Sequence, residues 1–277
     1  MDHRNAQVYT RAVESQQQKT PAMTPSPRSL LITGASSGIG EALARHYAGP
    51  GIHLALTGRD SARLDATAEA CRARGARVDA AAIDVTDRER LRDWSLRCDD
   101  AAPLDLVIAN AGTGTTAVAG VENETAARRV FATNIEGVLN TVFPVIPRMQ
   151  ARRSGQIALM SSIAAFRGFA EAPSYAASKA AVKSLGESWR LLLEPYGIRV
   201  STICPGFVAT RMTARNDFPM PFLMSADRAA AIIARGLARN KARIAFPPAM
   251  ALFGWLTEAL PPSLSDALLR RIERKQR

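Results

Sequence analysis

The feature that most constrains the fold is a short apolar run that enters a glycine-rich turn and continues into a helix-forming segment. Residues 29–32 read Ser-Leu-Leu-Ile, residues 33–40 read Thr-Gly-Ala-Ser-Ser-Gly-Ile-Gly, and residues 41–47 favour a helix. A strand that meets a helix through such a turn presents free backbone N–H groups and the positive helix end to a phosphate. Glycine lets the backbone approach a ligand closely because it carries no Cβ. We therefore expect a nucleotide site at the start of a parallel sheet.

The rest of the chain alternates short apolar segments with longer helical ones. Strands are expected at 29–33, 53–57, 77–83, 104–109, 155–161, 198–204 and 242–246. This alternation is typical of right-handed βαβ units with helices on both faces of the sheet, whose ligands bind at the carboxyl ends of the strands. The predicted fold class is α/β, a Rossmann-type doubly wound parallel sheet, in one catalytic domain of residues 29–246.

A second motif brings acid–base chemistry to this fold. Tyr175 and Lys179 are four residues apart and share a helix face, and Ser162 stands thirteen residues before Tyr175. A nearby cation lowers the pKa of a phenol, ordinarily about 10, so that Tyr175 could exchange a proton near neutral pH. Ser162 could hydrogen-bond the same substrate oxygen, and its neighbour Ser161 stands one residue too far. The Tyr-x-x-x-Lys spacing alone is common by chance, so its weight comes from the nucleotide site beside it.

Together these motifs resemble the short-chain dehydrogenase/reductase family over residues 28–245. Thr33 to Gly40 match T-G-x-x-x-G-x-G, and Ser162 with Tyr175 and Lys179 match the catalytic motif. The remaining family motifs are met by Asp84-Val85, Asn110-Ala111-Gly112, Asn134, and Pro205-Gly206 followed by Thr210. The resemblance implies the strand order 3-2-1-4-5-6-7 and an oxidoreductase that assembles as a homodimer or homotetramer.

The resemblance also assigns roles to individual residues. It implies that a hydride moves between nicotinamide and a carbonyl carbon while Tyr175 acts as acid or base, with Asn134, Ser162, Tyr175 and Lys179 as the catalytic set. Lys179 would hold the nicotinamide ribose, Asn134 a water that links Lys179 to solvent, and Asp84 the adenine. The implied cofactor-binding residues are Thr33, Gly34, Ser36, Ser37, Gly38, Ile39, Gly40, Arg59, Asp84, Val85, Asn110, Ala111, Gly112, Tyr175, Lys179, Pro205, Gly206, Val208 and Thr210.

The residues after the second strand bear on the choice of cofactor. NAD-specific sites place a carboxylate at that strand end to bind the ribose 2′-hydroxyl, whereas here Gly58 is followed by Arg59. A guanidinium suits the 2′-phosphate of NADP. We expect NADP(H) to be preferred, with NAD(H) as the alternative, because Asp60 could either pair with Arg59 or approach the ribose.

The segment expected to cover the site is rich in apolar side chains. Residues 206–224 contain Phe207, Met212, Phe218, Met220, Phe222, Leu223 and Met224, and Phe166 and Phe169 precede the tyrosine. Adaptable apolar linings suit a lipophilic small-molecule ketone, aldehyde or secondary alcohol. The alternative is that these side chains only pack the covering segment.

The two ends of the chain differ from the domain between them. Residues 1–28 contain a glutamine run and three prolines and lack apolar periodicity, which predicts a disordered tail. Residues 247–277 combine apolar and basic residues. We expect two short helices separated at Pro261-Pro262 that close one wall of the substrate pocket or meet a second subunit. The alternative is a peripheral contact with a membrane surface.

Composition narrows the remaining classes. The formal net charge is +11, but the basic residues are spread over many helices without a nucleic-acid-reading motif, so nucleic acid is not an expected partner. Three scattered cysteines fit a reducing, cytoplasmic compartment, and neither they nor the three histidines have metal-ligand spacing, so no metal is expected. A cofactor-binding sensor or membrane-surface scaffold of the same fold is the non-enzyme alternative, although sensors typically lose the tyrosine or lysine.

Overall fold

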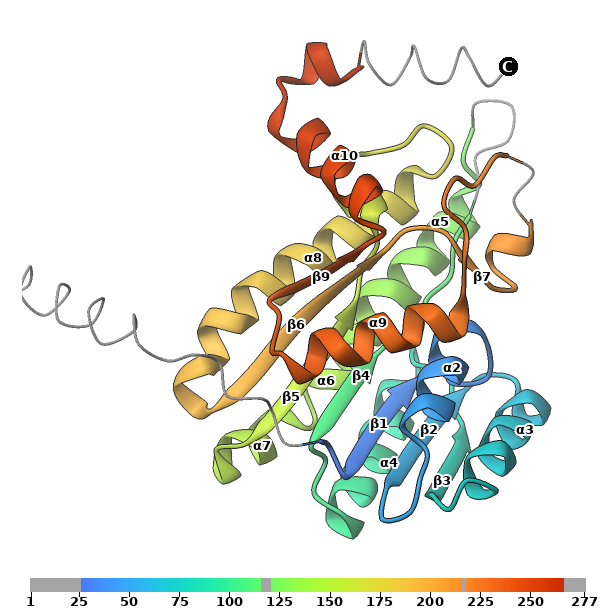
Figure 1. The fold of residues 1–277 in the computed structure, drawn as a ribbon, viewed down its shortest axis with the longest axis vertical. Helices are drawn as coiled ribbons and strands as arrows, with labels where there is room; N and C mark the ends of the chain where they lie inside the picture. The colour runs from blue at the N-terminus through green and yellow to red at the C-terminus, as the bar shows by residue number, and fades with distance from the viewer. Residues whose placement is uncertain (1–25, 116–120, 216–217, 267–277) are drawn as a thin grey trace, which may run out of the picture.

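The structure is a computed structural model that describes residues 26–115, 121–215 and 218–266. Its main sheet is parallel, in the order β3-β2-β1-β4-β5-β6-β9 (Figure 1). The strands are β1 (Ser29–Thr33), β2 (His53–Gly58), β3 (Arg77–Ala82), β4 (Leu106–Ala109), β5 (Gly155–Met160), β6 (Ile198–Pro205) and β9 (Arg243–Phe246). The predicted fold class and strand order are confirmed, with β9 as the seventh strand. The tail expected before residue 29 lies almost wholly outside the described residues.

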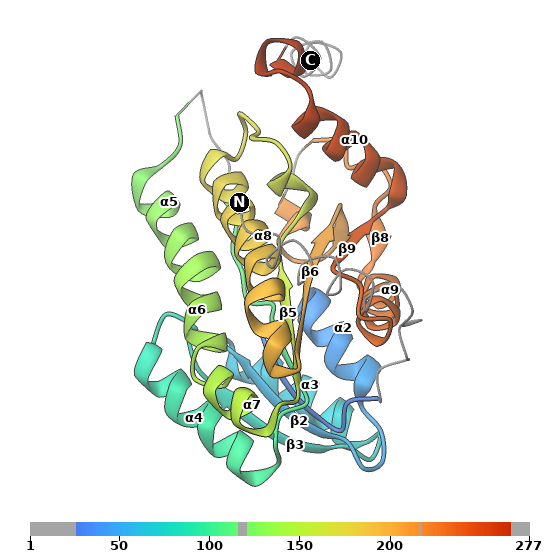
Figure 2. The ribbon, with the colours of Figure 1, turned by 90° about the vertical axis from the view of Figure 1, so that its left-hand side faces the viewer.

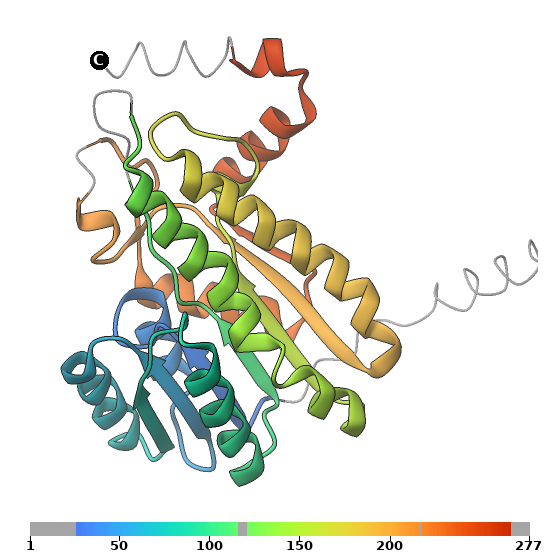
Figure 3. The same ribbon diagram turned by 180° about the vertical axis from the view of Figure 1, so that it is seen from behind.

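Helices cover both faces of this sheet (Figure 3). One face carries α2 (Gly38–Tyr47), α3 (Ser61–Arg72) and α9 (Ala226–Ala238). The other carries α4 (Arg88–Ala101), α5 (Glu124–Phe131), α6 (Gly137–Val142), α7 (Ile146–Arg152) and α8 (Pro173–Leu193). Successive residues of β1 enter opposite cores, because Leu30 and Ile32 pack with one group of helices and Leu31 with the other. Burial on both faces explains why this strand is a continuous apolar run.

Short polar side chains set where several helices begin. The Asp60 carboxylate accepts a hydrogen bond from the Arg63 amide at 3.0 Å and caps α3, and Asp87 and Ser225 cap α4 and α9 in the same way. Each cap satisfies a backbone donor that the first helical turn leaves without a partner. The carboxyl end of α8 passes into the 3-10 turn η3 (Glu194–Tyr196). This turn ends at Gly197, whose φ of 73° suits glycine.

Two features were not expected from the sequence. The segment that covers the site is bracketed by a two-stranded parallel pair, β7 (Val208–Ala209) and β8 (Met224–Ser225). Strands this short carry no readable periodicity. The other feature is that helix α10 (Pro248–Ala259) projects from the end of the domain instead of lying along the sheet (Figure 2).

The chain beyond α10 changes direction at Leu260 and Pro261, and residues 262–266 are helical again. Residues 267–277, the remainder of the predicted second helix, lie outside the described residues. Within the described ranges, no helix is both long and apolar enough to span a bilayer.

Candidate active site

The glycine turn after β1 forms a cradle that side chains could not occupy. Gly34 has a φ of 68°, and a Cβ on Gly40 would lie 2.3 Å from the Gly34 carbonyl oxygen. Helix α2 begins beside this turn, and Ser37 at its N-cap makes no side-chain hydrogen bond to the helix. The first N–H groups of α2 are therefore available to a bound phosphate. This geometry fits the pyrophosphate of a dinucleotide.

Asn110 and Thr33 lock the turn to the end of β4. The Asn110 Nδ2 donates to the Thr33 carbonyl oxygen at 2.8 Å, and the Thr33 hydroxyl accepts from the amides of Asn110 and Ala111 at 3.1 Å each. A Cβ on Gly40 would also lie 2.5 Å from the Asn110 Nδ2. Asn110 thus fixes the crevice between β1 and β4 through its own hydrogen bonds.

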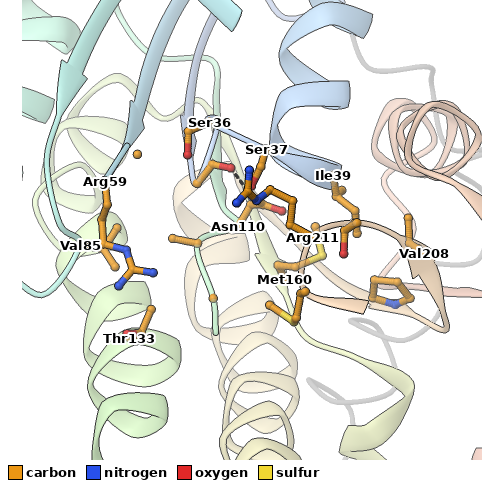
Figure 4. A pocket seen from close by; sticks show the side chains of 18 of the residues that line it. Ser36, Ser37, Ile39, Arg59, Val85, Asn110, Thr133, Met160, Val208 and Arg211 are labelled. Carbon is orange, nitrogen blue, oxygen red and sulfur yellow. Dashed lines mark hydrogen bonds between the residues drawn. The ribbon is translucent and has the colours of Figure 1, made fainter. Parts of the chain in front are cut away.

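The cleft at the carboxyl ends of the strands brings together almost all of the predicted site residues (Figure 4). Thr33, Gly40 and Asn134 are the exceptions, and they are buried behind the lining. Sequence reasoning missed several lining residues, namely Arg63, Ile83, Thr133, Met160, Arg211 and Thr213. Arg63 could have been found, because it lies in the first turn of the helix that follows Arg59 and Asp60.

The corner after β2 contains two arginines, Arg59 and Arg63, and a carboxylate, Asp60, that is already bound to one of them. Asp60 caps α3 and also pairs with Arg63, with 2.6 Å between Oδ2 and Nη1. The Nε of Arg63 is buried and has no hydrogen-bond partner among the described residues. Arg59 is 58% exposed and lies 3.9 Å from Asp84, a loose ion pair of little energetic weight. Asp60 was expected either to pair with Arg59 or to approach the ribose. The structure pairs it with Arg63 instead of Arg59, and Asp60 still lines the cleft.

Helix α8 places Tyr175 and Lys179 on the same wall of the cleft. The Lys179 Nζ lies 5.7 Å from the centroid of the Tyr175 ring and donates to the Met160 carbonyl oxygen at 2.8 Å. Ser162 opens the 3-10 turn η2 (Ile163–Ala165), where its hydroxyl accepts from the Ala164 amide at 3.1 Å. The three side chains expected to act together therefore meet at one place.

The protonation of this group differs from the sequence-based expectation. Burial raises the pKa of Tyr175 above its ordinary value, and a hydrogen bond with Ser162 opposes that rise only in part. Burial also lowers the pKa of Lys179 to about 8. The expected lowering of the tyrosine pKa by the lysine charge is therefore not seen, because desolvation disfavours the charged form of both groups. Tyr175 is a neutral phenol at pH 7, the form that can donate a proton.

Asn134 lies in a short π-helical segment, η1 (Ala132–Glu136), between α5 and α6. Its side-chain oxygen accepts from the Thr113 amide at 2.8 Å, and its Nδ2 donates to the Ser178 hydroxyl at 2.9 Å. A Cβ on Gly112 would lie 3.2 Å from the Asn134 oxygen and 3.3 Å from the Lys179 Nζ. Asn134 and Lys179 thus converge on Gly112, and π-helical turns are frequent at functional sites.

Glu122 clamps the start of the helix that carries Tyr175, a contact that sequence reasoning missed. Its carboxylate accepts hydrogen bonds from the Ser174 hydroxyl at 2.6 Å and from the Ser174 amide at 3.1 Å. The N-cap of α8, Ala172, offers no side-chain acceptor of its own. A carboxylate at a helix N-terminus satisfies a free donor and suits the helix dipole. Glu122 and Ser174 are 52 residues apart, so no local pattern signals their contact.

The covering segment closes over both halves of the cleft. A Cβ on Gly38 would lie 2.9 Å from Thr210, so this segment reaches the glycine turn. Met212 and the Tyr175 ring flank Gly114, each 3.8 Å from where its Cβ would stand. This places an apolar side chain opposite the tyrosine.

Phe166 does not line the cleft as expected. It is buried under α10, where Gly254 packs against its ring and where Lys183 and Arg243 lie 5.1 and 5.2 Å from its centroid. No residue of 247–266 lines the cleft either. α10 packs behind the lining, on the turn that begins at Ser162 and, through Met250, against Gly206.

Within the described part of the chain, no three His, Cys, Asp or Glu side chains lie together where they could hold a metal ion.

Comparisons with known proteins agree with this geometry. Residues 28–218 match the family model described as short chain dehydrogenase. An uncharacterized oxidoreductase of Myxococcus xanthus is 38% identical over 89% of this chain and 98% of its own length. A short-chain dehydrogenase from Sphingobium yanoikuyae solved in complex with NADPH is 28% identical and covers 84% of this chain and 96% of its own, with a TM-score of 0.74. A short-chain dehydrogenase/reductase from Burkholderia phymatum solved with NAD is 25% identical and covers 83% of this chain and 92% of its own, with a TM-score of 0.76.

With the motifs, the sheet and these matches in agreement, the chain belongs to the short-chain dehydrogenase/reductase family. It is an NAD(P)-dependent oxidoreductase that acts on CH–OH or C=O groups of a small-molecule substrate.

Proposed function

We propose that the protein interconverts a carbonyl and an alcohol on a lipophilic small molecule, with NADP(H) as the preferred cofactor and NAD(H) as the weaker one. The observation that carries this proposal is the meeting of Tyr175, hydrogen-bonded to Ser162, with Lys179 in a cleft that continues into the glycine cradle. The intact tyrosine and lysine argue against a cofactor sensor without turnover.

The site residues divide the chemistry among them. The nicotinamide cofactor, when bound, supplies or accepts the hydride. In the direction of reduction, neutral Tyr175 donates its proton to the substrate oxygen as negative charge develops there, and Ser162 donates a hydrogen bond to the same oxygen. Lys179 places a positive charge behind the phenol. Asn134 is held in place by Thr113 and Ser178. It would bind a water that links Lys179 to solvent, and through this water Tyr175 would regain the proton that it gives to the substrate.

The corner after β2 supports the cofactor preference. Gly58 stands where NAD-specific sites carry a carboxylate, and a Cβ there would lie 2.8 Å from the Ser36 hydroxyl, so such a side chain would displace Ser36. Asp60 is already committed to Arg63 and to the start of α3. Arg59 is largely exposed and only loosely paired with Asp84, so its guanidinium donors could bind the 2′-phosphate of NADP.

The apolar groups near Tyr175 support a lipophilic substrate. Met160 and Met212 line the cleft next to the tyrosine, and Met212 is 41% exposed. Methionine adapts to ligands of varied shape. Family membership supports assembly as a homodimer or homotetramer. The three buried free cysteines support a reducing, cytoplasmic compartment.

A turnover assay tests the proposal. The full chain would be given a panel of aliphatic and aromatic ketones, aldehydes and secondary alcohols with NADPH, NADH or their oxidised forms, and nicotinamide absorbance would be followed. We expect turnover on apolar members, with a higher kcat/KM for NADPH than for NADH. Tight NADPH binding without turnover on any member would favour the sensor instead.

A further inference from the structure

Helix α10 presents its apolar side chains outward, the reverse of an ordinary surface helix. Its packed face consists of Gly254 and Thr257, the two residues of α10 that are buried. The outer face consists of Leu252, Trp255, Leu256 and Ala259, at the spacing that places side chains on one side of a helix. The first three of these are 58%, 54% and 46% exposed. A face of this kind indicates an apolar partner.

The same end of the molecule gathers most of the large exposed apolar side chains of the described chain. The loop before α5, the segment that covers the cleft and the residues after α10 all contribute to it, and all lie at the end where α10 projects (Figure 1). Together with α10 they form an apolar rim made of Val121, Met212, Phe222, Leu223, Leu252, Phe253, Trp255, Leu256, Leu260 and Leu264. Of the rim residues, Met212 also lines the active-site cleft.

α10 is attached to the domain firmly enough to serve as a platform. Glu258 pairs with the buried Lys183 of α8 at 2.7 Å, Gly254 packs on Phe166, and Asp266 pairs with Arg167. These contacts hold the inner face against α8 and the η2 turn. They leave the outer face without a partner among the described residues.

We propose that this apolar rim docks on an anionic lipid bilayer surface, with the outer face of α10 inserted among the headgroups. The chain that directly follows the rim carries five basic residues and one acidic residue at positions 270–277. Such a segment next to an apolar helix face suits negatively charged lipids. Trp255 on the outer face is a residue type enriched at membrane–water interfaces.

A second copy of the chain is the less suitable occupant. A second copy carries the same formal net charge of +11, so two copies repel one another. A bilayer surface instead supplies opposite charge. Docking in this orientation would bring the cleft opening close to molecules dissolved in the lipid.

Vesicle binding by the full chain tests the proposal, and Trp255 provides an internal probe. Of the three tryptophans, Trp94 and Trp189 are buried and only Trp255 is exposed. We expect the protein to float with phosphatidylcholine/phosphatidylglycerol vesicles at low salt, with a blue shift of tryptophan emission and quenching by brominated lipid. Binding should fall at least tenfold on pure phosphatidylcholine or in 0.5 M salt.

A matched pair of variants separates this face from exposed apolar surface in general. The double variant Leu252→Glu/Trp255→Glu should lose vesicle binding by at least tenfold while keeping NADPH affinity, which shows that it is folded. The control Leu191→Glu/Leu192→Glu alters two leucines at the far end of α8 that are more exposed than Leu252 and Trp255, and it should bind as the parent does. Equal loss in both variants, or no flotation of the parent at low salt, would overturn the proposal. A dimer that sedimentation detects, and that only the α10 variant dissolves, would assign the face to a second copy.

Discussion

The two ends of the active-site region are built in opposite ways. In the cofactor half, at the carboxyl ends of β1 to β5, side chains are committed to buried hydrogen bonds, as Thr33, Asn110 and Asn134 are. At the α10 end, large apolar groups stand exposed on the outer face of the helix. The contrast indicates that the cofactor half fixes the positions of the reacting groups. The α10 end instead influences how substrates reach the cleft and which surface the protein binds.

The largest effect should come from the phenol in the cofactor half. Tyr175→Phe removes the group that exchanges a proton with the substrate, so turnover should fall by ~10²–10⁴-fold. The NADPH dissociation constant should stay within about twofold of the parent value, because the fold and the cradle are unchanged. Steady-state kinetics with fluorescence titration checks both values. Turnover within threefold of the parent would remove Tyr175 from the chemistry.

The next largest effect should be on cofactor choice. Arg59→Asp removes a cation at the 2′-phosphate and adds an anion, so the ratio of kcat/KM for NADPH over NADH should fall by ~10–100-fold, as expected for a lost charge-assisted hydrogen bond. Arg45→Asp, on the same face of the sheet but outside the cleft, is the control. An unchanged ratio would show that Arg59 does not read the phosphate.

A smaller effect should follow from loosening the start of α8. Glu122→Ala removes the acceptor for Ser174, and the loss of about 1 kcal/mol typical of a helix cap should lower kcat roughly fivefold with little change in NADPH affinity. Glu122→Gln keeps an acceptor and should recover most of kcat. Glu124→Ala, at a neighbouring exposed position, should behave as the parent. A uniform change in all three variants would point to general destabilisation.

Truncation after Phe246 tests how far the α10 end influences the chemistry. The truncation uncovers Phe166, which packs behind the Ser162 turn. The KM for bulky substrates should therefore rise by roughly threefold, a change that corresponds to the free energy of one weak surface interaction. Cofactor affinity should not change. Parental KM and parental thermal stability in the truncated chain would separate α10 from the active site altogether.

The smallest effect concerns stability and its dependence on pH. Lys179 is buried with its pKa lowered to about 8, against 10.5 in an unfolded chain, so folding penalises its charged form. The penalty is complete below pH 8 and fades as pH rises toward 10.5. In cofactor-free protein, Lys179→Met should therefore raise Tm by ~2–6 °C at pH 6.5 and by less at pH 9.5. Lys241→Met, an exposed position, should show no such pH dependence.

The sequence predicted the position of a feature correctly where that position depends on residues close together in the chain. The glycine turn, the Tyr175–Lys179 pair and the apolar run of β1 each occupy a few consecutive residues, and their placement follows from strand and helix geometry. The prediction failed where the determinant is a distant contact. Glu122 contacts Ser174, which lies 52 residues away in the chain. Phe166 packs under α10 instead of lining the cleft. Burial decides that the pKa of Tyr175 is raised and not lowered, and the spacing of residues in the sequence does not reveal burial.

The bond between Asn110 and Thr33 has a consequence for the order of events during folding. These residues are 77 positions apart in the chain, and their hydrogen bonds form only when β4 has taken its place beside β1. Contacts of such long sequence separation close late, because the entropy of ordering the intervening chain is lost first. The cradle therefore does not exist in a nascent chain that has completed only its first βα units. Dinucleotide binding then reports that β4 has paired with β1.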